Sequence, residues 1–366
     1  MKIEVMLYIY GAVCISMIVF NIIYNLLLQH REPLLKRRYR KMKNQIAFQL
    51  QNIENNGKIT ENHLHFLAKK LRRINGLIVF YRVISEMKKE PINCFDLYLN
   101  QIQPVVLYLA VEYLDKENLQ AGYFTYFLSQ CKTRRYRPMD SLQDILLKYL
   151  EKDNLYCRCN ALQALYDFGN EDHVIAALQL QDDGKVFIHE KILTEGLLSF
   201  TGDHEALIQK LWIAFSSFSV HTQQGILNYI RFQSGNYPVQ MFSIMQNETM
   251  DKELRLSAIR YFGKYYYAPA LEPLLHFVQD NDPDHWEYAT VAASALSLYG
   301  QEKVIEVLKD ALCSENWYIR YAAAQSLTAH HVEYSDLKDI LLGNDRYARE
   351  MITYHLESTK LQHAEV

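Results

Sequence analysis

The sequence predicts an all-α protein: an α-solenoid of helical hairpins preceded by one N-terminal transmembrane helix. Three observations support this prediction. The 366 residues include only 13 Gly and 8 Pro, too few turn residues for an all-β fold. The chain opens with a long uncharged segment, and from about Ser141 onward an apolar pattern recurs every 29–34 residues. A repeat of this length indicates stacked helical units.

The first predicted element is a membrane anchor over residues 1–29. Residues 5–28 carry no charged side chain, and a helix of that length spans a hydrocarbon core of about 30 Å. A cleavable signal peptide fits less well, because only Lys2 precedes the apolar run as a cation and no small-x-small cleavage motif follows it.

Cations beside the apolar run predict the orientation of the anchor. Because cations stay on the cytoplasmic side, the N-terminus is expected outside the cell membrane and the rest of the chain in the cytoplasm. We expect the same cations to contact an anionic lipid surface through residues 30–43. They are Arg31, Lys36, Arg37, Arg38, Arg40, Lys41 and Lys43.

Residues 30–58 are predicted to form a basic amphipathic helix. Pro33 suits the first turn of a helix, and an apolar side chain then recurs every three or four residues from Leu35 to Ile53. The helix is expected to end at Asn55-Asn56-Gly57. Two placements remain open, because such a helix can lie on a membrane or cover the open end of the repeat stack.

Residues 59–140 are predicted to form irregular helical hairpins. Thr60 can cap the first helix, Asn75-Gly76 indicates a stop, and Pro104 marks the start of a later helix. Residues 118–131 form one more expected helix. At the junction with the repeats, Arg134, Arg135 and Arg137 form a basic candidate for partner binding.

The regular repeats are predicted over residues 141–358, followed by a tail at 359–366. One copy reads Arg158-x-x-Ala161-x-x-x-Leu165-x-x-x-Gly169. Residues at i and i+4 share one face of a helix, and a Gly after them can adopt the left-handed conformation that stops the helix. Because one helical pair cannot bury both of its faces, the pairs must stack. The positions equivalent to Ala161 are Ala161, Leu193, Ile226, Ala258, Ala292, Ala323 and Ile352.

This pattern resembles HEAT repeats, and specifically the short HEAT-like units of bacterial proteins, here in a membrane-anchored form. In that family an acidic or amide residue in the turn pairs with an Arg early in the second helix. The resemblance implies that second helices line a concave, partner-binding side. The matching pairs are Asp153/Arg158, Asp251/Arg255, Asn316/Arg320 and Asp345/Arg349.

The sequence offers little sign of catalysis, a metal or a cofactor. It contains no phosphate-binding loop, dinucleotide fingerprint, nucleophile elbow or zinc-protease helix. The six cysteines are scattered and fit reduced thiols. Residues 91–366 hold 23 Lys and Arg against 36 Asp and Glu, and this acidic balance argues against nucleic acid as a partner.

A membrane-tethered scaffold or adaptor that binds a protein partner through its concave surface is therefore the first hypothesis. Aromatic side chains and Arg dominate binding hot spots. A specific form is an accessory subunit of a membrane-embedded glycosyltransferase that makes surface polysaccharide. A HEAT-like enzyme of the lyase or glycosylase type is the alternative. The candidate residues on the second helices are Tyr229, Arg231, Tyr261, Tyr265, Tyr266, Tyr288, Tyr318 and Tyr321.

Overall fold

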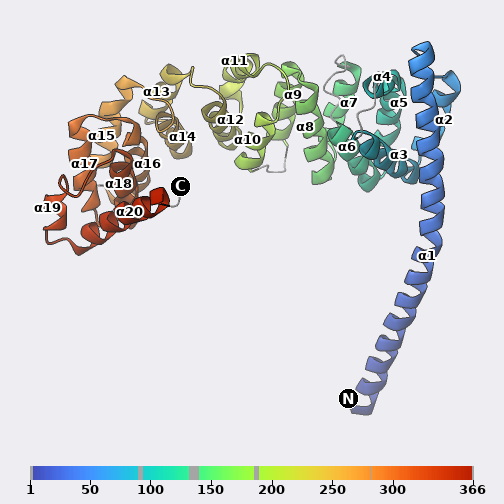
Figure 1. Cartoon of the computed structure of the whole chain (residues 1–366), viewed down its shortest axis with the longest axis horizontal. Coiled ribbons are helices and arrows are strands. Elements are labelled where there is room, and N and C mark those ends of the chain that lie inside the picture. Colours follow the sequence, from blue (N-terminus) through green and yellow to red (C-terminus); the bar gives the residue numbers. More distant parts are fainter. Residues whose placement is uncertain (1–2, 90–93, 132–139, 185–188, 281, 365–366) are drawn as a thin grey trace. The chain divides into compact units, whose positions relative to one another are not determined.

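The computed structural model describes residues 3–89, 94–131, 140–184, 189–280 and 282–364. Within these ranges every regular element is a helix (Figure 1), which confirms the all-α part of the prediction. The chain forms two compact units, residues 1–173 and 174–366. Each unit is built from helices stacked in two layers.

In the first unit, α3, α6 and α8 pack against one another in turn, and α2, α5 and α7 form the second layer. α6 has the bounds that were predicted from the sequence. Pro104 lies in the first turn of α5, as expected. The helices are α1 (Ile3–Asn56), α2 (Glu61–Leu71), α3 (Ile74–Met87), α4 (Phe95–Gln101), α5 (Gln103–Leu114), α6 (Asn118–Cys131), α7 (Asp140–Leu150) and α8 (Leu155–Phe168).

The C-terminal half of α1 covers the end of this unit by packing on α3 and α4. Met42, Ile46, Leu50 and Ile53 are all buried there, so the apolar stripe of the basic helix faces protein. Of the two placements left open by the sequence, the structure favours the cover over the stack. Gly57, with φ of 69°, ends the helix as expected.

The N-terminal half of α1 extends away from the other helices of the first unit (Figure 1). Its apolar side chains from Tyr8 to Tyr24 are mostly exposed. The helix continues without a break from Ile3 to Asn56, where the sequence analysis expected an anchor and a separate basic helix.

The prediction of a transmembrane anchor is corrected by the structure. In the part of the chain that is described, no helix combines the length and the apolar character needed to cross a membrane. The single-pass placement at the cell membrane, with its predicted orientation, is wrong for the same reason.

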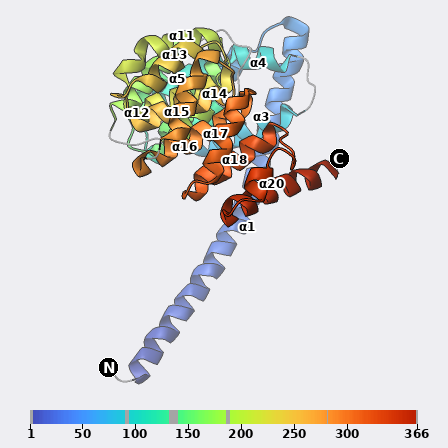
Figure 2. The same cartoon turned by 90° about the vertical axis from the view of Figure 1, so that its left-hand side faces the viewer.

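In the second unit, α10, α12, α14, α16, α18 and α20 pack in order and form what we call the second-helix layer. Figure 2 labels α12, α14, α16, α18 and α20 of this layer. The first helices of the pairs cover one side of it. The helices are α9 (Glu171–Asp182), which begins in the first unit, α10 (Glu190–Leu198), α11 (His204–Ala214), α12 (Val220–Gln233), α13 (Pro238–Gln246), α14 (Lys252–Phe262), α15 (Leu271–Gln279), α16 (Trp286–Ala295), α17 (Glu302–Leu312), α18 (Trp317–Ala329), α19 (Lys338–Leu341) and α20 (Arg346–Ala364).

The predicted repeat positions form the core of this layer. The six positions of this layer that are equivalent to Ala161 are buried, and so are the six residues four places after them. Ala161 and Leu165, which belong to α8 in the first unit, are buried as well. Small residues bring neighbouring helices close together. A side-chain carbon on Gly225 would lie 2.5 Å from Leu193 Cδ2, and the Thr194 hydroxyl donates a hydrogen bond to the Gly225 carbonyl at 3.0 Å.

The helix ends confirm only some of the predicted stop signals. Gly169, with φ of 71°, caps α8 in the left-handed conformation. Gly76 instead lies in the first turn of α3, because α3 begins earlier than predicted. A side-chain carbon there would be 2.1 Å from the Lys70 carbonyl oxygen, so close backbone contact is what requires glycine.

A buried histidine links α2 to α4 in the first unit. His63 Nε2 lies 2.9 Å from the Tyr98 hydroxyl, and both side chains are buried. Burial lowers the pKa of His63 to about 4, because the charged imidazolium is disfavoured away from water.

We expect the stability of the first unit to fall as the pH is lowered from about 6.5 to about 4. In this window the unfolded chain takes up a proton at His63, and the folded chain does not. His63→Gln removes this titration, so its melting temperature should fall less than that of the wild type over the same range. Thermal unfolding by circular dichroism at several pH values measures the difference. Parallel curves for the two proteins would contradict the assignment.

Candidate partner-binding surface

The turns between the paired helices position the candidate surface. Asp251 accepts a hydrogen bond from the Glu253 backbone N–H at 2.8 Å and so caps α14. Arg255 then donates from Nε to the Met245 carbonyl in the preceding helix at 3.1 Å. The repeat Arg therefore satisfies carbonyl groups at the end of the first helix, which helix geometry leaves unpaired.

The same arrangement recurs two helical pairs further along the chain, between α17 and α18. Asn316 accepts from the Tyr318 N–H at 2.9 Å, and Arg320 donates from Nη1 to the Ser314 and Glu315 carbonyls at 2.7 and 3.2 Å. Within the described residues no carboxylate of these turns forms an ion pair with the repeat Arg. The family expectation of Asp–Arg pairing is thus replaced by two separate capping interactions.

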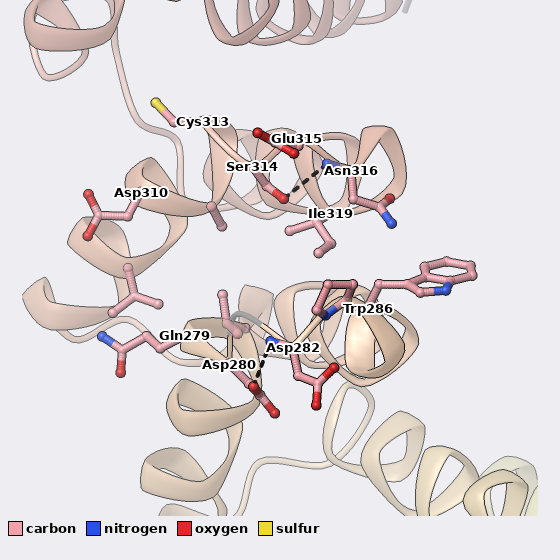
Figure 3. Close-up of a pocket in the computed structure, with 14 residues that line it drawn as sticks. Gln279, Asp280, Asp282, Trp286, Asp310, Cys313, Ser314, Glu315, Asn316 and Ile319 are labelled. Atoms are coloured by element: carbon pink, nitrogen blue, oxygen red, sulfur yellow. Dashed lines mark hydrogen bonds between the residues drawn. The ribbon is translucent and has the colours of Figure 1, made fainter.

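Two consecutive turns border an open groove, which we call the acidic groove (Figure 3). The turn after α15 carries Asp280 and Asp282, and the turn after α17 carries Glu315. Asp310, near the end of α17, adds a fourth carboxylate. The groove has a volume of about 650 Å³, within the ~300–1,000 Å³ range typical of ligand pockets.

The carboxylates of the acidic groove are not neutralised by Lys or Arg in the described part of the chain. The backbone N–H of Asp282 and the side chain of His285 hold the pKa of Asp280 below its usual range. His285 Nδ1 lies 2.8 Å from Asp280.

Exposed aromatic rings continue the surface from the groove onto the second-helix layer. Trp286 lines the groove and stacks on Tyr318 with ring centres 5.2 Å apart. Tyr318 meets Trp317 edge to face at 5.3 Å, and Trp317 stacks on Tyr321 at 5.1 Å. We call these four rings the aromatic strip. Trp317 and Tyr318 are 50% and 55% exposed.

A second cavity of about 410 Å³ lies beside the aromatic strip, between α18 and α20. Trp317 and Tyr321 form one wall, and Tyr347 and Tyr354 belong to the other. The Arg320 guanidinium lies 5.3 Å from the centre of the Tyr347 ring, a cation–π distance. The repeat Arg therefore holds the turn and also supports an exposed aromatic wall.

Some predicted site residues belong to the core. Tyr229, Tyr261 and Tyr288 are buried, because each ring lies between successive repeats. The Tyr229 hydroxyl is 2.7 Å from His204 Nδ1, the Tyr261 hydroxyl accepts from the Tyr237 N–H at 3.0 Å, and Tyr288 stacks on Phe277. We therefore leave these three out of the candidate surface.

Other predicted residues gather at the opposite ends of the second helices. Tyr265 and Tyr266 follow the end of α14, and Arg231 lies in the last turn of α12. Tyr266 is 56% exposed and contacts the Tyr299 ring at 5.0 Å. Of the tyrosines predicted for one surface, only Tyr318 and Tyr321 lie on the aromatic strip. Arg134, Arg135 and Arg137 lie outside the described residues.

Sequence reasoning missed the two tryptophans of the strip and the acidic turns. Trp286 and Trp317 each open a second helix. Asn316 is the N-cap residue immediately before Trp317. A cap at this position places Trp317 in the first turn of α18, where its side chain is exposed. That signal was available in the sequence.

The predicted lipid-facing cations lie on α1. Lys36, Arg37, Arg38, Arg40 and Lys41 are exposed. Lys43 instead forms an ion pair with Glu86 of α3 at 2.7 Å. The side chain of Arg31 lies outside the described residues.

Residues 241–328, from α13 to α18, match the family model for HEAT repeats. This part of the chain is built from HEAT-like repeats. The match covers three helical pairs and includes the acidic groove and the aromatic strip. A search of curated proteins returned no match to the chain. HEAT repeats generally mediate protein–protein interactions. Within the described residues no cluster of His, Cys, Asp or Glu is arranged to hold a metal ion.

Replacing Arg320 by Met should lower the free energy of unfolding by about 1–3 kcal/mol, because two carbonyls lose a charged donor. Arg346→Met is the matched control. Arg346 forms an exposed ion pair with Glu350, and such pairs contribute at most about 1 kcal/mol. Urea denaturation of both variants measures the difference. Equal losses would show that the Arg320 hydrogen bonds do not stabilise the turn.

Proposed function

We propose that this chain is a HEAT-like repeat scaffold that binds a protein partner through the acidic groove and the aromatic strip. The observation that carries the proposal is the continuity of the two features. Trp286, which is one of the four rings of the strip, also lines the groove and stacks on Tyr318. Trp and Tyr are the residues most enriched in binding hot spots.

The chemistry of the surface defines the partner segment that it fits. Asp280, Asp282, Asp310 and Glu315 favour Lys or Arg in the groove, because opposite charges steer encounter and set the register of a complex. The neighbouring rings favour an apolar or aromatic side chain. The partner segment that we propose therefore places Lys or Arg next to an apolar or aromatic residue.

The aromatic strip is tested by binding the purified chain to a peptide array in which cationic, apolar and acidic residues are varied systematically. Peptides that combine Lys or Arg with an aromatic residue should bind best. Trp317→Ala/Tyr318→Ala should weaken this binding at least ~10-fold, since loss of a hot-spot ring costs more than about 1.4 kcal/mol. Tyr156→Ala/Leu119→Ala, two highly exposed positions in the first unit, is the control. Equal binding by both double variants would contradict the proposal.

The acidic groove has its own test. Asp310→Asn/Glu315→Gln should slow association with the selected peptides and reduce its dependence on salt, because two steering charges are lost. Glu306→Gln/Glu333→Gln removes the same charge at exposed positions that do not line the groove. Stopped-flow association rates at two salt concentrations measure both variants. If the two pairs behave alike, net charge rather than the groove accounts for the effect.

A further inference from the structure

A second, basic site lies in the first unit, where α1, α2 and the start of α3 meet. Arg38 and Lys41 of α1, Lys70 of α2 and Arg73 before α3 line one cavity of about 230 Å³. We call it the basic pocket. No Asp or Glu is among the residues that line it. We propose that the basic pocket binds the phosphate group of a small phosphomonoester or pyrophosphate-type anion.

Two cations next to the basic pocket form ion pairs with carboxylates, whereas the four cations that line the pocket form none with the residues that the structure describes. Lys43 is paired with Glu86 at 2.7 Å, and Arg72 with Glu112 at 2.6 Å. Glu86 belongs to α3 and Glu112 to α5, and neither residue lines the basic pocket. Within the described residues, none of the four cations of the basic pocket has an ion pair of its own.

The backbone brings the four cations together. Gly76 leaves room for the Lys70 carbonyl, which a side-chain carbon would approach to 2.1 Å. The turn from α2 to α3 is therefore very short and places Lys70 and Arg73 on one wall. Leu71 and Leu77, on either side of this turn, are buried and hold it in place.

The opposite wall is fixed by contacts between α1 and α3. The Tyr39 hydroxyl donates a hydrogen bond to Glu86, which also receives Lys43. Met42, between Lys41 and Lys43, is buried and lines the pocket from the inside. These contacts orient Arg38 and Lys41 toward the α2–α3 turn without using their charges.

The chemistry of the pocket fits a phosphate group better than a carboxylate. Four positive charges suit a divalent or more highly charged anion, and Arg presents paired N–H donors that match phosphate oxygens. The α3 helix also begins here with no side chain capping its N-terminus, and free N–H groups at that end favour an anion. The volume is below that of pockets for drug-sized ligands, which favours a compact headgroup.

Titration calorimetry of the full chain with inorganic pyrophosphate, at low salt, tests the proposal. Lys41→Gln/Arg73→Gln should weaken pyrophosphate binding ~10-fold or more, because each substitution removes a charge-assisted hydrogen bond. Arg37→Gln/Lys69→Gln is the matched control. It removes the same charge from the adjacent positions of α1 and α2, which do not line the pocket. When the titration is repeated at about 0.15 M salt, the control should bind within about 2-fold of the wild type, since exposed charges more than about 8 Å from the ligand are largely screened there.

The source of the phosphate is distinguished with vesicles. Phosphatidic acid presents a phosphomonoester, and phosphatidylserine presents a phosphodiester. A phospholipid headgroup as ligand predicts stronger binding to phosphatidic acid than to phosphatidylserine, with the preference lost in Lys41→Gln/Arg73→Gln. A free phosphorylated molecule predicts pyrophosphate binding without that preference. The proposal is overturned if pyrophosphate fails to bind, or if the test and control variants weaken binding equally.

Discussion

A helical hairpin leaves one apolar face exposed, and burial of that face against the next hairpin is the constraint on which the second unit depends. The stripe at i and i+4 runs through every second helix of this unit and is buried in all six copies there. Small residues such as Ala258 and Ala292 let the backbones approach closely. Each second helix packs against the second helices before and after it, so the side chains on those two faces are buried. Only the side chains on the remaining surface are available to bind a partner.

The turns between helices connect this packing to the candidate surface. A capping Asp or Asn accepts a hydrogen bond from a backbone N–H group at the start of a second helix. The repeat Arg donates to carbonyl groups of the preceding helix or of the turn that follows it. Both polar requirements are met inside one repeat. The large rings that follow the cap, such as Trp317, are then free of any structural hydrogen bond and lie on the surface.

The two units differ in the charge of their candidate sites. In the second unit, carboxylates of consecutive turns face a shared groove with no Lys or Arg to balance them in the described residues. In the first unit, the carboxylates nearest the basic helix are paired with Lys43 and Arg72, and the remaining cations meet in a pocket. The charges of the two proposed sites therefore favour ligands of opposite sign.

The sequence by itself determined the helical class, the repeat and its buried stripe, because local periodicity decides which face of a helix is apolar. It also indicated the helix ends at Gly57 and Gly169, but it left open whether the basic helix covers the stack or lies on a membrane. It did not determine which tyrosines are exposed. Tyr261 and Tyr318 occupy second helices alike, yet one is buried between repeats and the other is exposed.

Tertiary structure decided the sites, because each joins residues that are distant in the chain. The acidic groove needs turns from two repeats, and the basic pocket needs α1 beside the α2–α3 turn. The structure also shows one continuous helix, Ile3–Asn56, in place of the separate anchor and basic helix that were predicted. Local patterns specify each element, whereas the spacing of charges and rings in space follows only from how the elements pack.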